Sequence, residues 1–236
     1  MQILALDTCD AAGSVALLRD KSLLQCERHT VQEDYSSWLL PAVKGLLSAE
    51  KVNLGSIEVF AVAAGPGSFT GVRVGLTTVK AWAEIYQRPI AAVSRLQALA
   101  EESSGVARYV AAFFDARRKQ TFGALYRRDL ELRMIDEEVV IAPEQYLEWC
   151  VSQIGTNRID WISPQPECLT NVPGWAARQD RGERVQEFTG ALAPSIGQIG
   201  LRLAEEGNLT DALRLDANYI RRSDAEILWK GAKHGS

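Results

Sequence analysis

The fold is decided by one stretch of the chain, residues 58–75, which reads EVFAVAAGPGSFTGVRVG. Residues 58–64 form a largely apolar run typical of a buried strand, and a glycine-rich turn follows directly. Apolar residues then recur at helical spacing, and Ser68 is of the residue type that caps a helix start. The stretch therefore predicts a buried strand, a tight turn and a long helix that ends near Gln87.

The residues around this unit predict a complete lobe. An apolar strand at residues 3–6 leads through a turn into a second strand, as in a β-hairpin. The predicted order for residues 1–100 is strand, strand, strand, helix, strand, helix, strand, helix. The predicted members are strands at 3–6, 14–18, 22–27, 58–64 and 90–93, and helices at 36–48, from the glycine turn to about 87, and from 94 to about 102.

The second half of the chain repeats the pattern of the first. An apolar strand at residues 109–114 ends at Asp115, as the first strand ends at Asp7. We expect a diverged tandem duplication, with one lobe in residues 1–104 and the other in residues 105–236, whose tail packs back on the first lobe. The further predicted elements are strands at 121–126, 131–141 and 159–162 and helices at 143–154 and 194–206, with residues 163–190 unassigned.

Composition excludes several classes of protein. Of 236 residues, 47% are hydrophobic and 24% charged, close to the averages for globular proteins, so a disordered chain is excluded. No apolar run approaches the roughly 20 residues that span a bilayer, and residues 1–7 lack the basic start of a secretion leader. The four cysteines are scattered without a CxxC pair. We therefore expect a cytoplasmic protein without a membrane span, disulfide framework or zinc site.

The charge distribution argues against direct RNA binding. Residues 1–100 carry nine basic and nine acidic side chains, and residues 101–236 carry 17 and 21, which gives a net charge of −4. Binding to nucleic acid normally requires Lys and Arg concentrated on one face, because phosphate contacts supply most of the affinity. The small basic groups at 117–119, 127–128 and 221–222 are interpreted as solvated surface residues.

The glycine-rich turn matches neither common nucleotide motif. No Gly-Lys-Ser/Thr follows it, as a Walker A loop requires, and its glycines have the wrong spacing for a dinucleotide GxGxxG. Backbone N–H groups at such a turn can meet an anion, but the glycines can equally serve only close packing. Asp7-Thr8 resembles the first phosphate loop of the sugar-kinase and actin superfamily, where an aspartate helps to position magnesium. The candidate residues of a vestigial nucleotide or anion site are Asp7, Thr8, Gly65, Gly67 and Ser68.

Catalysis by this chain is not predicted. The turn after Asp115 lacks a glycine that would let phosphate approach, which disfavours phosphate transfer, although a nucleotide-hydrolysing enzyme remains the alternative hypothesis. The chain has only two histidines, His29 and His234, and these cannot form the HExxH helix face of a metallopeptidase. No catalytic residues, intrinsic metal site or intrinsic cofactor are expected.

The long helix after the glycine turn has two faces that favour burial. Gly71, Gly75, Thr78 and Trp82 fall on one stripe at helical spacing, beside a second, aliphatic stripe. One stripe is expected to face the helix's own sheet. The other is a candidate for a subunit interface, and internal packing is the equal alternative.

Several segments together resemble the TsaB (YeaZ) family. They are Ile3-Leu4-Ala5-Leu6-Asp7-Thr8, Ser14-Val15-Ala16-Leu17, the run from Gly65 to Gly75, Asp115-Ala116-Arg117-Arg118, and the tail Ala217-Asn218-Tyr219-Ile220-Arg221, where Ala217 replaces the family's proline. The resemblance covers residues 1–125 and the tail, and it is weak over 130–210. The long Gly-Pro-Gly-Ser-Phe-Thr-Gly-Val-Arg run is its most specific part.

The resemblance implies both a fold and a function. The fold is α/β, with two actin-like (ribonuclease H-like) lobes that each hold a mixed five-stranded sheet flanked by helices. The implied function is that of a non-catalytic scaffold that binds and activates TsaD, the transferase for threonylcarbamoyladenosine formation beside the tRNA anticodon. ATP or ADP and metal are then expected on TsaD, and tRNA is contacted only through the complex.

The resemblance also implies how the subunits meet. It implies pairing with TsaD through helices of the N-terminal lobe, recruitment of the ATPase TsaE to that pair, and a homodimer when the chain is alone. Trp38, on the helix of residues 36–48, and the stripe Gly71, Gly75, Thr78 and Trp82 are placed at that contact.

Overall fold

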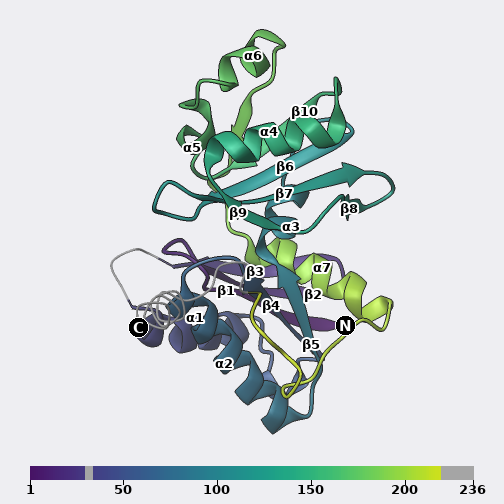
Figure 1. Cartoon of the computed structure of the whole chain (residues 1–236). Helices are drawn as coiled ribbons and strands as arrows, with labels where there is room; N and C mark the ends of the chain where they lie inside the picture. The colour runs from purple at the N-terminus through teal and green to yellow at the C-terminus, as the bar shows by residue number, and fades with distance from the viewer. Residues whose placement is uncertain (30–33, 219–236) are drawn as a thin grey trace, which may run out of the picture.

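The computed structural model describes residues 1–29 and 34–218, which form two β-sheets stacked one above the other with helices around and between them (Figure 1). Residues 219–221 of the tail motif, the basic pair at 221–222 and His234 lie outside the described residues. Among the described residues, no helix combines the length and apolarity needed to cross a membrane.

The first sheet has five strands in the order β3-β2-β1-β4-β5. Strands β1, β2 and β3 pair antiparallel, whereas β1, β4 and β5 pair in parallel. Its elements and adjoining helices are β1 (Gln2–Asp7), β2 (Ser14–Arg19), β3 (Ser22–Arg28), α1 (Tyr35–Ala49), η1 (Leu54–Ser56), β4 (Val59–Gly65), α2 (Phe69–Tyr86), β5 (Ile90–Ser94) and α3 (Arg95–Glu101).

Helices cover both faces of this sheet, which explains why its central strands are apolar along their length. All seven residues of β4 are buried. On α2, a Cβ on Gly75 would come within 3.4 Å of Val62, while on α7 a Cβ on Gly200 would come within 2.8 Å of Ala61. Neighbouring residues of a strand point to opposite faces, so α2 and α7 lie on opposite sides of the sheet, as Figure 1 shows.

The second sheet has six strands, not the five expected. Its order is β11-β10-β6-β7-β8, with β9 also paired to β7. Its elements and adjoining helices are β6 (Tyr109–Asp115), β7 (Thr121–Arg128), β8 (Leu132–Met134), β9 (Val139–Ile141), α4 (Pro143–Ile154), β10 (Ile159–Ser163), α5 (Glu167–Thr170), α6 (Trp175–Asp180), β11 (Val185–Glu187) and α7 (Ala193–Glu205).

Two segments account for the difference from the predicted elements. The single strand expected at 131–141 is interrupted by the acidic residues 136–138, and its two parts, β8 and β9, pair with opposite ends of β7. The unassigned residues 163–190 contain two short helices and the edge strand β11. The predicted α/β class, with two lobes built on mixed sheets flanked by helices, is confirmed.

The last part of the chain belongs in space to the first lobe. Helix α7 packs on β1, β2 and β4, where Gly197 contacts Leu18 and Gly200 contacts Ala61. Beyond α7, Thr210 bridges Ile90 on the edge of the first sheet. Up to residue 218, the end of the described chain, the segment after α7 lies against the first lobe, in the direction expected for the tail. Helix α7 itself, which the sequence division placed in the second lobe, also packs on the first sheet, where two glycines let it lie close.

Two glycines in helices allow a matched test of this packing. Gly200→Ala is expected to lower the free energy of unfolding by about 1 kcal/mol or more, because the new methyl group overlaps Ala61. Gly45→Ala, at an exposed interior position of α1, is expected to raise it by about 0.5–1 kcal/mol through helix propensity alone. Urea denaturation of both variants measures whether each substitution lowers or raises the free energy of unfolding. A stabilising Gly200→Ala would contradict the packing of α7.

Candidate functional site

The candidate site lies where β1 and β4 end side by side. The two strands pair in parallel, so Asp7 and Thr8 leave the sheet beside the turn that begins at Gly65. Carboxyl ends of parallel strands meet at one edge of a sheet, where ligands commonly bind in α/β proteins. The structure brings the residues of the predicted anion site together at this edge: Asp7, Thr8, Gly65, Gly67 and Ser68.

The polar groups of this turn are engaged within the chain. The Ser68 N–H donates to the Cys9 carbonyl over 2.7 Å, and the Ser68 hydroxyl accepts from the Gly71 N–H over 3.0 Å, which caps α2. A side chain on Gly67 would place its Cβ 2.3 Å from the Cys9 carbonyl oxygen. Gly65, at φ 117°, lies against the Asn218 carbonyl. The geometry therefore favours close packing, the second of the two interpretations of these glycines.

Thr8 fixes α2 against the end of β1. Its hydroxyl donates to the Gly71 carbonyl over 2.7 Å. A Cβ on Gly71 would lie 2.1 Å from the Thr8 carbonyl oxygen, and a Cβ on Gly75 would lie 2.6 Å from the Thr8 hydroxyl. Both glycines are buried on the inner face of α2. The stripe of small residues serves internal packing at these two positions, which corrects their placement on a subunit surface.

The other residues placed at the partner contact differ in exposure. Trp38 is 6% exposed and packs edge-on against His29, with ring centroids 5.0 Å apart. Trp82 is also buried, with its ring 5.7 Å from that of Phe60. Thr78 is half-buried and its hydroxyl donates to the Val74 carbonyl. The two tryptophans are therefore mainly core residues, because their rings fill the space beneath α1 and α2.

Asp7 is paired with a residue that the sequence analysis missed. The Asp7 side chain is 1% exposed, and one carboxylate oxygen accepts from the Cys9 N–H over 2.9 Å. The other oxygen accepts from Nε of Arg95, the first residue of α3, over 3.1 Å. A sequence signal for Arg95 existed, since it shares a helix face with Leu99 in a segment whose other residues are mostly apolar. Nothing in the sequence indicated that Arg95 pairs with Asp7, which lies 88 residues away.

An aromatic cluster supports the hairpin turn that follows Asp7. His29 stacks on Tyr35 with ring centroids 4.2 Å apart, and the Tyr35 hydroxyl donates to the Asp10 backbone carbonyl. Burial, followed by the charge of Asp7, raises the pKa of Tyr35. Burial also raises the pKa of the Cys9 thiol well above its ordinary value, so this cysteine stays a neutral core residue and not a nucleophile. The cluster therefore positions the turn and is not arranged for catalysis.

The outer face of α1 and α2 holds an apolar groove. A cavity of about 590 Å³ lies between these helices, and a second of about 300 Å³ adjoins it across Leu40. Leu40 is 57% exposed and Phe69 is 40% exposed, with the Arg73 guanidinium 3.7 Å above the Phe69 ring. Thr78 lines the first cavity and Trp82 the second. Of the predicted interface residues, only Thr78 and Trp82 line this groove, and its most exposed apolar side chains are Leu40 and Phe69.

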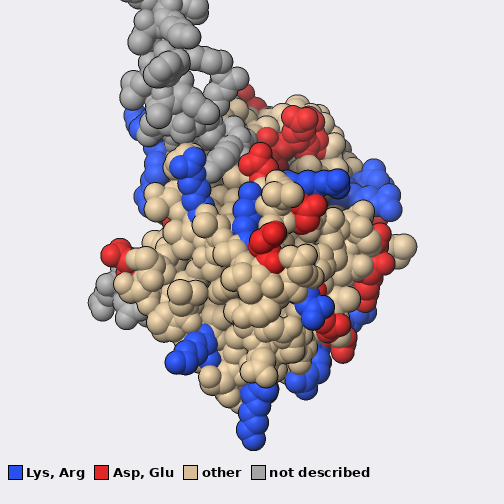
Figure 2. Space-filling view, turned by 90° about the horizontal axis from the view of Figure 1, so that it is seen from below, with Lys and Arg blue, Asp and Glu red and all other residues tan. Residues whose placement is uncertain are grey.

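Few charges interrupt this face. Lys44, Arg73, Lys80 and Glu84 are the charged residues of α1 and α2. Figure 2 views the first lobe from below and shows a broad area without charged side chains, with Lys and Arg at its edge. The uncharged residues around the groove include serine and threonine as well as the exposed Leu40 and Phe69. Exposed apolar side chains gathered on one face are a feature that interaction surfaces share.

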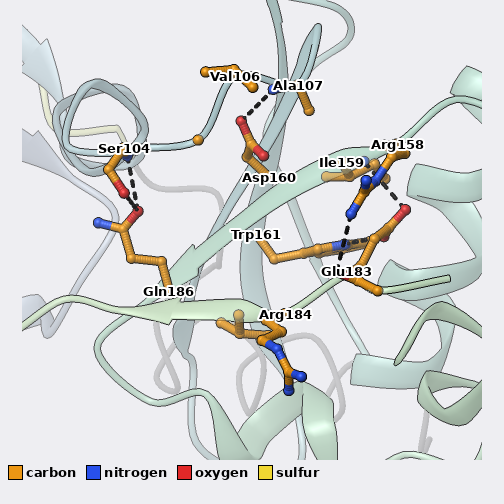
Figure 3. Close-up of a pocket in the computed structure, with 13 residues that line it drawn as sticks. Ser104, Val106, Ala107, Arg158, Ile159, Asp160, Trp161, Glu183, Arg184 and Gln186 are labelled. Carbon is orange, nitrogen blue, oxygen red and sulfur yellow. Dashed lines mark hydrogen bonds between the residues drawn. The ribbon is translucent and has the colours of Figure 1, made fainter. Parts of the chain in front are cut away.

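A third cavity, of about 720 Å³, lies in the second lobe at the amino ends of β10 and β11 (Figure 3). Two of its polar side chains are hydrogen-bonded to backbone N–H groups: an Asp160 oxygen accepts from the Ala107 N–H over 2.8 Å, and the side-chain Oε1 of Gln186 accepts from the Ser104 N–H over 2.9 Å. Arg184 points away from these pairs in Figure 3. The contacts tie the linker between the lobes to the second sheet, so the cavity has a structural role.

The comparisons with known proteins agree on one family. The family model described as "TsaD: tRNA N6-adenosine threonylcarbamoyltransferase" matches residues 29–165. The chain is 35% identical to the tRNA threonylcarbamoyladenosine biosynthesis protein TsaB of Bacillus subtilis, over 97% of this chain and 98% of that relative. It is 30% identical to TsaB of Escherichia coli, over 98% of this chain and 97% of that relative.

A solved structure gives the same result for the fold. YeaZ from Pseudomonas aeruginosa superposes with a TM-score of 0.74 at 28% identity, covering 92% of this chain and 99% of that one. The similarity therefore extends over both lobes and not only over the glycine-rich segment.

The contact between α2 and Thr8 predicts coupled effects of two substitutions. Gly75→Ala is expected to lower the free energy of unfolding by about 1–3 kcal/mol, because its methyl group meets the Thr8 hydroxyl. In a Thr8→Ala background, which removes that hydroxyl, the same change is expected to cost at least about 0.5 kcal/mol less. Denaturation of the two single variants and the double variant measures the coupling, and additive effects would show that Gly75 does not pack on Thr8.

Proposed function

We propose, from the premise that the chain belongs to the TsaB family of tRNA threonylcarbamoyladenosine biosynthesis proteins, that it is a non-catalytic subunit which binds and activates TsaD. Membership of the family rests on relatives matched over nearly their whole length. Family membership connects the chain to the biosynthesis of threonylcarbamoyladenosine in tRNA, which is the process given in the names of those relatives. The match to the TsaD family model supports a paralogue of the transferase as the partner.

The contacts at the β1 hairpin support a non-catalytic role. A nucleotide-hydrolysing enzyme, the alternative hypothesis, would need Asp7 free to face a metal or phosphate, but Arg95 pairs with it. It would also need donors at the glycine turn, but the Ser68 N–H is bonded to Cys9. Transfer chemistry, with its ATP or ADP and metal, is therefore assigned to TsaD. In this proposal tRNA meets the chain only within the complex, in the cytoplasm.

The outer face of α1 and α2 is the proposed contact with TsaD, and its apolar groove is the observation that carries the proposal. Leu40 separates the two cavities of this face and is more than half exposed, as expected of a residue that a partner covers. The groove lies above the buried Trp82 and beside the half-buried Thr78. The proposed interface therefore keeps the helices predicted from the sequence, but its contacting side chains differ from the predicted ones. A homodimer of the isolated chain would use the same face, and TsaE would join the assembled pair.

A charged side chain placed at an exposed apolar position of the groove tests the proposed interface. Leu40→Asp is expected to weaken binding to TsaD about thirtyfold or more, the effect of a residue that contributes about 2 kcal/mol at an interface centre. The Leu40→Asp variant should fold as the unchanged chain does, because Leu40 is exposed in the isolated chain. Titration of purified TsaD with each variant, followed by calorimetry, measures the affinity.

Leu130→Asp is the matched control, because Leu130 is a fully exposed leucine on the second lobe, away from α1 and α2. This variant should bind TsaD as the unchanged chain does. A Leu40→Asp variant that binds TsaD as tightly as the unchanged chain does would refute the interface. Equal weakening in both variants would also refute it, because the loss would then not be specific to the groove.

A further inference from the structure

Arg95 sits at the junction of the two lobes and is 3% exposed. Its Nε donates to Asp7 over 3.1 Å, and its Nη1 lies 3.7 Å from a carboxylate oxygen of Asp10. The face of its guanidinium lies 4.2 Å from the ring centroid of Phe114, on β6 of the second sheet. One side chain therefore contacts two carboxylates of the first lobe and an aromatic ring of the second.

A buried carboxylate such as Asp7 requires a counter-charge, because an isolated ion in a protein interior is strongly destabilising. Two kinds of cation meet this need: a bound metal ion, which carboxylates hold through oxygen, or a side chain. Burial acts to lower the pKa of Arg95, but the charge of Asp7 and its neighbours outweighs burial and raises it. The guanidinium is thus a permanent positive charge at this position.

The magnesium ion that the superfamily resemblance implies at the hairpin aspartate does not fit these residues. One Asp7 oxygen accepts from Arg95, and the second accepts from the Cys9 N–H. Asp10 is directed at the same guanidinium. A divalent cation would have to displace a buried arginine that is paired with both carboxylates.

We propose that Arg95 is a built-in counter-cation, which takes the place of a metal ion at the Asp7 and Asp10 carboxylates and excludes one from them. The charge of the buried Asp7 is thereby balanced by the chain itself, and Asp10 shares the same guanidinium. The structure of the hairpin is then independent of metal and of any nucleotide carried by a metal.

Stability measurements on the full chain test the counter-charge. Arg95→Met, which keeps most of the side-chain volume without the charge, should raise the unfolding equilibrium constant on the order of a hundred- to a thousandfold. The double variant Asp7→Asn/Arg95→Met should recover most of this loss, because an amide needs no counter-charge. Should Arg95→Met be too unstable to purify, the double variant alone decides. A double variant as unstable as the single one would overturn the proposal, because Arg95 would then act only by packing.

Luminescence of Tb³⁺ tests the exclusion of metal. Tb³⁺ binds carboxylate oxygens as Ca²⁺ does, and Tyr35, bonded to the Asp10 carbonyl, is placed to sensitise its emission. Emission excited through tyrosine is expected with Arg95→Met and not with the unchanged chain, with Arg95→Lys or with the double variant. Ca²⁺ at millimolar concentration should also restore part of the stability of Arg95→Met.

Arg95→Lys is the matched control, since it keeps the charge and loses only the planar shape. Emission from the unchanged chain that Asp7→Asn abolishes would overturn the proposal, because the carboxylates would then be open to metal with Arg95 in place. A stable Arg95→Met variant that gives no emission would also overturn it, because the carboxylates would then not form the position of a cation.

Discussion

The close approach of α2 to the end of β1 is the constraint on which the first lobe depends. Thr8 and Cys9 lie so near the start of the helix that Gly67, Gly71 and Gly75 have no room for a side chain. The Thr8 hydroxyl and the Ser68 N–H then join the two segments by hydrogen bonds. Because β1 and β4 are neighbours in the sheet, this contact fixes the whole β4–α2 unit, and with it the orientation of the outer helix face.

The same contact separates the geometry of this turn from that of a phosphate loop. A phosphate loop keeps its backbone donors directed at an open site, and its glycines make space for the ligand. Here the glycines make space for the chain's own β1 strand, and Arg95 supplies the positive charge next to Asp7. The strand, turn and helix order of a nucleotide site is retained, while each named group has an internal partner.

Much of the fold was predictable because burial leaves a periodic pattern. The strand at 58–64 and the following helix appear within one residue of their predicted starts, since both are buried on a face that the apolar spacing records. Contacts between segments that are far apart in the sequence leave no periodic pattern. The pattern of residues 194–206 shows a helix with one buried face, but not that this face meets the first sheet through Gly197 and Gly200. Helices of four and six residues, α5 and α6, are too short to show a period.

The site was predictable in position and not in chemistry. Asp7 was identified from its resemblance to a phosphate loop, and the glycine turn from its place between a strand and a helix. The parallel pairing of β1 and β4 brings the two together. Arg95 was not identified, because a salt bridge between distant residues depends on tertiary contact alone. The small-residue stripe was identified but its direction was not, because a glycine leaves no hydropathy signal to distinguish an inner face from an outer one.

Helix α2 presents different residues to β1 and to the groove. Gly71 and Gly75 let it approach Thr8, whereas Phe69 and Arg73 line the groove together with Leu40 of α1. The close packing at the carboxyl end of β4 and the exposed apolar side chains of the groove are therefore two sides of one helical layer. A groove bordered by exposed apolar side chains is a feature that interaction surfaces share, and the proposed contact with another protein rests on that observation.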